Sequence, residues 1–310
     1  MMAGHNPPGI RLVLPATSAN LGPGFDAAAL AMSMHLTVEA HIAPTWQIHA
    51  TGRDAELCAK LENNLIFDTY RGVLEHAGRA VHPLKLNLHN EIPLGMGCGS
   101  SAAALCAGVA LADHFGDLKL GDAGIVAEAS RLEGHPDNVA ACWHGGFTVS
   151  AQNGDKVEVA TFAGDVGWQM MLAMQSTSLA TKKARALLPE SYSKPDTIFN
   201  VQRVALLVSA FAQQRLDLLR TAMQDRMHQP YRQEACPLLK VLLPLADEPE
   251  IAGVALSGAG PSVLIFLGGE TSLLEAETRI RALVQGDVEL VPLRVAEGAS
   301  RAVLADVPHK

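Results

Sequence analysis

The chain has 310 residues, of which 48% are hydrophobic and 18% are charged. This length allows a large core and two domains, and the composition excludes a disordered or membrane-spanning chain. The net charge of −8 excludes a broad nucleic-acid surface, which would need a basic face, but it leaves room for a local anion site.

Cysteine usage and the N-terminal residues bear on the compartment. The five cysteines are odd in number and show no CxxC or Cys/His metal spacing, which indicates reduced thiols. The opening MMAGHNPPGIRLVLPA lacks the basic segment and apolar run of a signal peptide. Nowhere are there the about 18 consecutive apolar residues that a membrane span needs. We therefore expect a cytoplasmic protein that binds no membrane.

The first half of the chain alternates predicted strands and helices. In order, they are a strand at 10–14, a loop of small residues at 15–26, paired strands at 34–42 and 46–51, a helix at 64–78 capped by Asn63 or Asn64, a half-buried strand at 84–88, and helices at Ala102–His114 and about 120–132. A polar segment, EGHPDN, follows at 133–138. Strands near 147–151 and 157–162 then predict a hairpin with Asn153-Gly154 at its turn.

The pattern changes from about residue 165. In order, we expect a strand at Gln169–Gln175, a mostly helical region at roughly 180–247, a strand–glycine turn–strand unit in VALSGAGPSVLIFLG, a helix at 272–284 and a last strand at 287–294. No long linker separates the two halves, so we place the boundary between domains 1–163 and 164–310.

The stretch PLGMGCGSSAAA, residues 93–104, joins a predicted strand to a predicted helix through alternating glycines. Backbone N–H groups at a helix start are unpaired and lie at the positive end of the helix dipole, so such a join can hold phosphate. A Walker loop is excluded because it needs a lysine, and a Rossmann fingerprint because the third glycine is missing. The glycines alone are equally consistent with a tight turn, but Ser100 and Ser101 add hydroxyls and favour phosphate.

This stretch closely resembles the ATP-binding motif of the GHMP kinases, P-x-G-x-G-L-G-S-S-A-A. Two further motifs of that family stand in the right order, LPATSANLGPGFD at 14–26 and LSGAGPSVLIF at 256–266. The first of them, and EGHPDNVAACWHGGF at 133–147, are similar to the homoserine kinase branch in particular. Cys98 stands where the family usually has Leu, and Ala141 where it usually has Pro, so we expect altered packing there with activity kept.

The resemblance implies the fold, the reaction and the partners. The fold would be α+β with two domains, an N-terminal ribosomal-protein-S5-like domain and a C-terminal ferredoxin-like domain. The reaction would be ATP-dependent phosphorylation of the L-homoserine hydroxyl in threonine biosynthesis, with Mg²⁺ as cofactor. Analogy with the family alone suggests a homodimer. Alternatives are a GHMP kinase for mevalonate or a sugar, and a catalytically silent member that senses a ligand.

The resemblance also assigns the nucleotide and metal residues. The ATP-binding residues would be Pro93, Leu94, Gly95, Met96, Gly97, Cys98, Gly99, Ser100, Ser101, Ala102 and Ala103. The magnesium ligands would be Glu133 and a serine hydroxyl, that of Ser100 or Ser101, because Mg²⁺ needs few carboxylates beside its waters. Glu128 competes with Glu133, but a solvated helix face explains Glu128 better. The Cys98 thiol lies within the motif, so we expect bound ATP to protect it from alkylation.

The two charged groups of an amino acid substrate indicate which side chains could bind it. The ammonium group needs acceptors, and Asn20 and Asp26 match the family's positions, although an Asx-turn and a helix cap would also explain these two. The carboxylate needs bidentate donors, for which Arg185 and Arg232 match, a surface salt bridge being the alternative for Arg232. Other substrate residues implied by the family are Thr181, His135 and Gly258.

Two residues compete for the chemical step. Asp137 would act as a general base toward the substrate hydroxyl, and Asn138 would instead orient that hydroxyl while charge stabilisation lowers the barrier. The sequence leaves both roles open, and a turn formed by HPDN is the alternative without catalysis.

Overall fold

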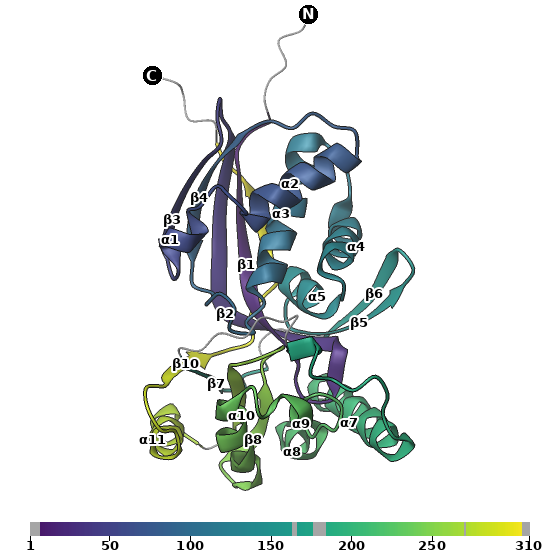
Figure 1. Cartoon of the computed structure of the whole chain (residues 1–310), viewed down its shortest axis with the longest axis vertical. Coiled ribbons are helices and arrows are strands. Elements are labelled where there is room, and N and C mark those ends of the chain that lie inside the picture. The colour runs from purple at the N-terminus through teal and green to yellow at the C-terminus, as the bar shows by residue number, and fades with distance from the viewer. Residues whose placement is uncertain (1–6, 163–165, 176–183, 270, 306–310) are drawn as a thin grey trace, which may run out of the picture.

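The computed structural model describes residues 7–162, 166–175, 184–269 and 271–305, and it confirms the expected α+β architecture in two parts (Figure 1). The upper part of Figure 1 holds a seven-stranded sheet, the first sheet, with strand order β11-β1-β2-β4-β3 and with β5 pairing to β2 and to β6. Its elements are β1 (Ile10–Asn20), β2 (Gly24–Ile42), β3 (Gln47–Gly52), α1 (Ala55–Cys58), α2 (Leu65–His76), β4 (Leu84–Asn90), α3 (Ser100–Gly116), α4 (Gly121–Glu133), α5 (Asp137–His144), β5 (Phe147–Asn153), β6 (Lys156–Phe162) and β11 (Ser300–Val303).

The lower part is built on a four-stranded sheet, the second sheet, with order β10-β7-β9-β8. Its elements are β7 (Met170–Met174), α7 (Lys194–Ala212), η1 (Leu216–Leu218), α8 (Leu219–Ala222), α9 (Gln229–Arg232), α10 (Pro237–Leu242), η2 (Leu243–Asp247), β8 (Ile251–Leu256), β9 (Val263–Leu267), α11 (Leu273–Leu283) and β10 (Glu289–Leu293). The strands β7, β8 and β9 are buried along their whole length, as their continuous apolar runs require.

Helices α2 to α5 cover one face of the first sheet (Figure 1). Helix α3 is the central one: its residues are mostly Ala, Leu, Val and Gly, and eleven of its seventeen residues are buried. The expected cap of α2 is Asn64, whose side chain accepts from the N–H groups of Ile66 and Phe67. The glycine stretch therefore opens a helix that lies inside the core and cannot shift independently of the sheet.

The expected loop at 15–26 is wrong for most of its length. Strand β1 continues to Asn20 and pairs with β2, with register shifts at Pro15/Ala16 and Ala19/Asn20. The small residues have a packing role, because Ala19, Ala29 and Ala141 form one buried cluster between these strands and α5. The small residues that suggested a loop are instead explained by the close approach of helix α5.

Other elements also differ from expectation. Residues 34–42 and 46–51 do form strands, but β4 lies between them, antiparallel to β2 and parallel to β3. Helix α5 was not expected, since HPDN predicts a turn and the helix has only eight residues. Strand β11 was missed because all four of its residues are exposed and show no apolar alternation.

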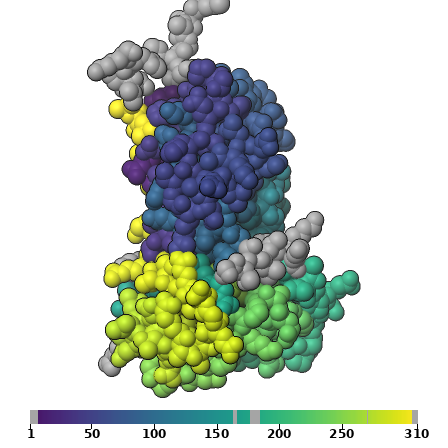
Figure 2. All heavy atoms as spheres, turned by 60° about the vertical axis from the view of Figure 1, so that its left-hand side comes forward, coloured from purple at the N-terminus to yellow at the C-terminus, as the bar shows by residue number. Residues whose placement is uncertain are grey.

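Strand β11 returns the chain to the first sheet, where it pairs antiparallel with β1 from Ile10↔Val303 to Val13↔Ser300. Figure 2 shows these yellow residues on the upper part of the molecule, apart from the larger yellow region below. The expected boundary between residues 163 and 164 lies outside the described residues. Residues of both chain ends thus belong to the first sheet.

Candidate active site

The motif segments that are far apart in sequence meet between the two parts of the molecule. The N–H of Gly258 donates to the Ala19 carbonyl at 3.1 Å, and Asn20 Nδ2 donates back to the Gly258 carbonyl at 2.9 Å. The hydroxyl of Ser257 donates to the carbonyl of Gly97 at 2.8 Å. These bonds tie the three motifs around one cleft, of which the lining residues include Asn20, Phe25, Asp26, Gly95, Gly97, Cys98, Gly99, Ser100, Ser101, Glu133, His135, Asp137, Asn138, Arg185, Arg232 and Gly258.

The glycine stretch has no room for side chains at two of its glycines. Gly97 has φ +75°, and a Cβ there would lie 2.2 Å from the Ser257 carbonyl oxygen. Gly99 has φ +70°, and a Cβ there would lie 1.9 Å from the hydroxyl oxygen of Thr17. The backbone from 97 to 99 is thus pressed against the first and third motifs, and glycine is required at both positions.

The start of α3 is open to a ligand. Its N-cap is Gly99, and no side chain among the described residues caps the helix, so the N–H groups of its first turn face the cleft without a side-chain acceptor. The Ser101 hydroxyl donates to Glu133 Oε2 at 2.8 Å, which places a hydroxyl and a carboxylate side by side at this end. Ser100 lines the same cleft.

The Cys98 thiol is not available for reaction. It is only 1% exposed, and burial raises its pKa to about 12, against a weaker opposing effect of the Ser262 hydrogen bond. A buried thiol with so high a pKa has little thiolate at neutral pH. We therefore revise the sequence-based expectation: alkylation of Cys98 should be slow with and without ATP.

An apolar pocket of about 440 Å³ adjoins the glycine stretch and was not predicted from the sequence. It lies between the segment from α1 to α2 and strand β4, and it shares Ser100 with the cleft. Its lining includes Leu57, Cys58, Leu65, Ile66, Leu88, Ile92, Leu94 and Ala104. A flat apolar group attached to a phosphate at α3 would reach this pocket.

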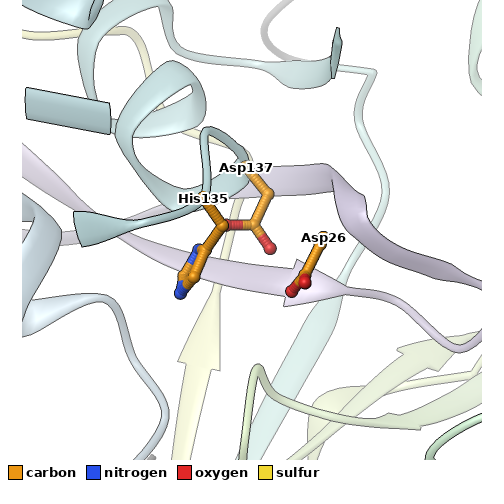
Figure 3. Close-up of side chains that lie close together, drawn as sticks. All are labelled: Asp26, His135 and Asp137. Carbon is orange, nitrogen blue, oxygen red and sulfur yellow. The ribbon is translucent and has the colours of Figure 1, made fainter. Parts of the chain in front are cut away.

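His135, Asp137 and Asp26 bring their polar atoms within 4.8 Å of one another (Figure 3). The carboxylate of Asp137, which is 1% exposed, binds His135 Nδ1 at 2.6 Å through Oδ1 and accepts the N–H of Asn138 at 2.7 Å. Figure 3 shows the other carboxylate oxygen of Asp137 pointing toward Asp26. Burial favours the neutral form of His135, but the hydrogen bond and charge of Asp137 outweigh it and raise the pKa of His135.

Asp26 and Arg185 form a bidentate ion pair, with both N–O distances at 2.8 Å. Asp26 lies in strand β2, so the alternative of a helix cap is excluded. Asn20 Oδ1 accepts the N–H of Asp26 at 3.1 Å, so the amide of Asn20 already bonds to protein on both sides. The ion pair is partly exposed and therefore contributes little to stability, which leaves it free to rearrange around a ligand.

Arg232 is a buried cation facing neutral partners. It is 2% exposed, which excludes the alternative of a surface salt bridge. Its guanidinium donates to the carbonyls of Ala184 and Gly258, each at 3.3 Å, and to His228 Nδ1 at 3.1 Å. Burial, with repulsion from Arg185, lowers its pKa. Among the described residues, no carboxylate makes a salt bridge with Arg232, so its guanidinium is available to pair with an anionic group of a ligand.

The structure thus brings most of the expected site residues to one cleft. Among the exceptions, Ala102 and Ala103 are buried in α3, Leu94 lines the apolar pocket, and Pro93 and Met96 line the outer side of the glycine stretch. Thr181 lies outside the described residues. Sequence reasoning missed Phe25, whose ring is 5.4 Å from the Arg185 guanidinium and 5.5 Å from that of Arg232. The only signal for it was its place beside Asp26.

Fold and cleft together define a GHMP kinase. The profile of the GHMP kinases N-terminal domain matches residues 64–146, and that of the GHMP kinases C-terminal matches residues 207–285. A homoserine kinase of Solibacter usitatus is 45% identical over 82% of this chain and 84% of its own, and one of Synechocystis is 39% identical over 81% and 83%. The chain therefore belongs to the homoserine kinases of the GHMP kinase family.

A solved structure agrees with the two-domain fold expected from the sequence. The crystal structure of homoserine kinase from Cytophaga hutchinsonii matches 97% of this chain and all of its own, with a TM-score of 0.78 at 23% identity. That likeness concerns the fold. Among the described residues, no helix has both the length and the apolar character to cross a bilayer.

Proposed function

We propose that this protein transfers the γ-phosphoryl group of ATP to the side-chain hydroxyl of L-homoserine, giving ADP and O-phospho-L-homoserine, a step of threonine biosynthesis. The observation that carries the proposal is the single cleft in which an open helix start and a glycine cradle face two arginines and two aspartates. Phosphoryl transfer needs little covalent chemistry from the protein, only positioning and neutralised charge.

The glycine stretch and the first turn of α3 would hold the triphosphate of ATP. The backbone N–H groups point at the phosphates, and glycine allows the close approach. The apolar pocket beside Ser100 would take the adenine ring, because it lies next to the cradle and is lined by leucines and isoleucine. ATP would then span from that pocket to the cleft, with its terminal phosphate toward Asp137 and Asn138.

Magnesium fits the oxygen donors at the start of α3. Ser101 and Glu133, already in contact, and the neighbouring Ser100 would hold it, since Mg²⁺ prefers carboxylate and hydroxyl oxygens with several waters. When bound, the ion neutralises phosphate charge. The residues of the chain do the rest: α3 orients the phosphates, and Asn138, whose Oδ1 accepts from Thr17 at 2.7 Å, presents its amide in a fixed direction.

The charges of the cleft match a zwitterion. Asp26 would receive the ammonium group, and Arg232 with Arg185 would receive the carboxylate. The Asp26–Arg185 pair would open as the amino acid enters, each partner taking the opposite charge of the substrate. Homoserine bound in this way would extend its hydroxyl toward Asp137 and Asn138.

ADP release measured separately with homoserine, mevalonate and galactose tests the proposal. We expect turnover with homoserine alone, because neither of the other two carries both an ammonium group and a carboxylate. Turnover with mevalonate or galactose, or ATP binding without turnover of any of the three, would contradict it and favour another GHMP kinase or a ligand sensor.

Replacing Asp137 with asparagine separates the two candidate roles in the chemical step. If the carboxylate is an obligatory base, kcat should fall by about 100-fold or more, since general base catalysis contributes about that much. A near-normal kcat assigns the orienting role to Asn138. Loss of the carboxylate should in either case lower the raised pKa of His135, which NMR titration of the imidazole measures and which verifies that the site was altered as intended.

A further inference from the structure

The buried residue His228 lies behind the substrate arginine and has no part in the mechanism described so far. It is fully buried, between the turn that joins β1 to β2 and helix α9. Its Nε2 is 2.7 Å from the Gly22 carbonyl oxygen, and its Nδ1 is 3.1 Å from Nη1 of Arg232. The contact with Gly22 spans 206 residues of sequence, and that with Arg232 spans four.

These contacts fix both the tautomer and the charge of His228. A carbonyl can only accept, so the proton lies on Nε2, and a guanidinium can only donate, so Nδ1 must carry a lone pair. The imidazole is therefore neutral, with one donor and one acceptor used. Protonation would place an N–H of His228 against an N–H of Arg232 and break the contact.

The groups around His228 hold this state. Burial, the largest effect, lowers the pKa of His228, and Arg232 on α9 acts in the same direction, against opposing effects of Asp225 and Asp26. Asp225 also lies beside the imidazole, with Oδ2 3.5 Å from Nε2, and its carboxylate accepts from Asn200 at 2.7 Å and from the N–H groups of residues 227 to 229 at 2.7 to 3.0 Å. Phe25 packs against the imidazole with its ring centre at 5.4 Å.

The partner of Nε2 is also held in place. Gly22 has φ +87°, and a Cβ there would lie 2.1 Å from the carbonyl oxygen of Met223, so the turn is pressed against the end of α8. The same turn separates Asn20 from Asp26, the residues at the ammonium end of the cleft. His228 thus has one rigid contact on each side.

We propose that His228 is a positioning residue, which links the turn carrying the ammonium-binding groups to the guanidinium of Arg232 and so sets the distance between the two ends of the bound amino acid. The inference rests on the proposed function. It explains how a cation without a carboxylate in salt-bridge contact among the described residues is held in one orientation. The distance between the groups that bind the carboxylate and those that bind the ammonium is then set by the fold.

Two variants separate the contacts. His228→Gln keeps an amide near the position of Nε2, where it can donate to Gly22, but offers no acceptor to Arg232. His228→Asn keeps an acceptor near the position of Nδ1. We expect His228→Gln to raise KM for homoserine by about 10-fold, with kcat and KM for ATP within about twofold, and His228→Asn, which keeps the acceptor for Arg232 but loses the bond to Gly22, to raise it by about threefold.

An amino alcohol without the carboxylate, 3-amino-1-propanol, distinguishes a positioning role of His228 from a purely structural one, because only a structural loss would weaken its binding. Its inhibition constant against homoserine should be the same in the parent and in His228→Gln, because it does not reach Arg232. Equal weakening of homoserine, ATP and 3-amino-1-propanol, or an unchanged KM for homoserine in His228→Gln, would overturn the proposal. Failure of the parent enzyme to phosphorylate homoserine would instead count against the proposed function.

A pH profile keeps the proposal testable if His228→Gln does not fold. In the parent, KM for homoserine should rise as the pH falls well below 6.5, because protonated His228 loses its acceptor. In His228→Asn this rise should be absent, while the contribution of His135, whose pKa is raised, remains in both proteins and cancels in the comparison. Identical profiles in the two proteins would overturn the proposal.

Discussion

Arg232→Met should raise KM for homoserine by about 100-fold, the equivalent of about 3 kcal/mol, because it removes charge-assisted hydrogen bonds from a buried site. Methionine fills much of the same volume, so the core around α9 stays packed. Steady-state kinetics with homoserine and ATP varied separately measure the effect, and KM for ATP should be nearly unchanged, since the phosphate cradle lies on α3.

Arg226→Met is the matched control for this substitution. Arg226 lies just before α9, the helix that ends at Arg232, but it is half-exposed, pairs with Asp196 at 3.3 Å and stacks on Phe199 away from the cleft. We expect parent-like constants for it. If Arg232→Met keeps the parent KM for homoserine, the carboxylate binds elsewhere and the assignment of Arg232 fails.

Glu133→Gln should lower kcat by about 100-fold and raise the concentration of Mg²⁺ needed for half-maximal rate. Among the described residues that line the cleft near the start of α3, Glu133 supplies the one carboxylate, and the substitution removes it. Glutamine still accepts from Ser101, so the start of α3 keeps its local hydrogen bond. Rates measured across a magnesium titration separate the two effects.

Glu128→Gln on the same helix is the control. Glu128 binds Arg131 through two hydrogen bonds at 2.7 and 2.8 Å and does not line the cleft. Its side chain is only 20% exposed, so the expected solvated face is only partly present, and its place outside the cleft is what separates it from Glu133. Parent-like turnover of Glu128→Gln beside a large loss in Glu133→Gln would assign the metal to the cleft, and an equal loss in both would contradict that assignment.

The parts of the cleft that short motifs encode could be predicted from the sequence. The glycines at 97 and 99 and the serines after them are local signals for a backbone that a ligand approaches closely. Their spacing also indicates the join between a strand and a helix, although helix α3 begins at Ser100, two residues before the predicted start at Ala102. A short sequence motif is enough to predict a binding site where the backbone of that same short segment forms the site.

Contacts between distant segments had no such signal. In the sequence, His228 is a single histidine within a region expected to be helical. Its two partners are a main-chain carbonyl and an arginine that only the fold brings together. The apolar pocket was missed for the same reason, since its leucines come from α1, α2, β2, β4 and the glycine stretch. Strands 34–42 and 46–51 look like neighbours because they are consecutive, yet β4 enters between them later in the chain.

The position of β11 has a consequence for how the chain folds as it is synthesised. Strand β1 is made among the first 20 residues, but its outer edge stays without a partner until residues 300–303 have left the ribosome. The backbone N–H and C=O groups of such an open edge can pair with another chain. The nascent chain therefore exposes this edge from the synthesis of β1 until that of β11.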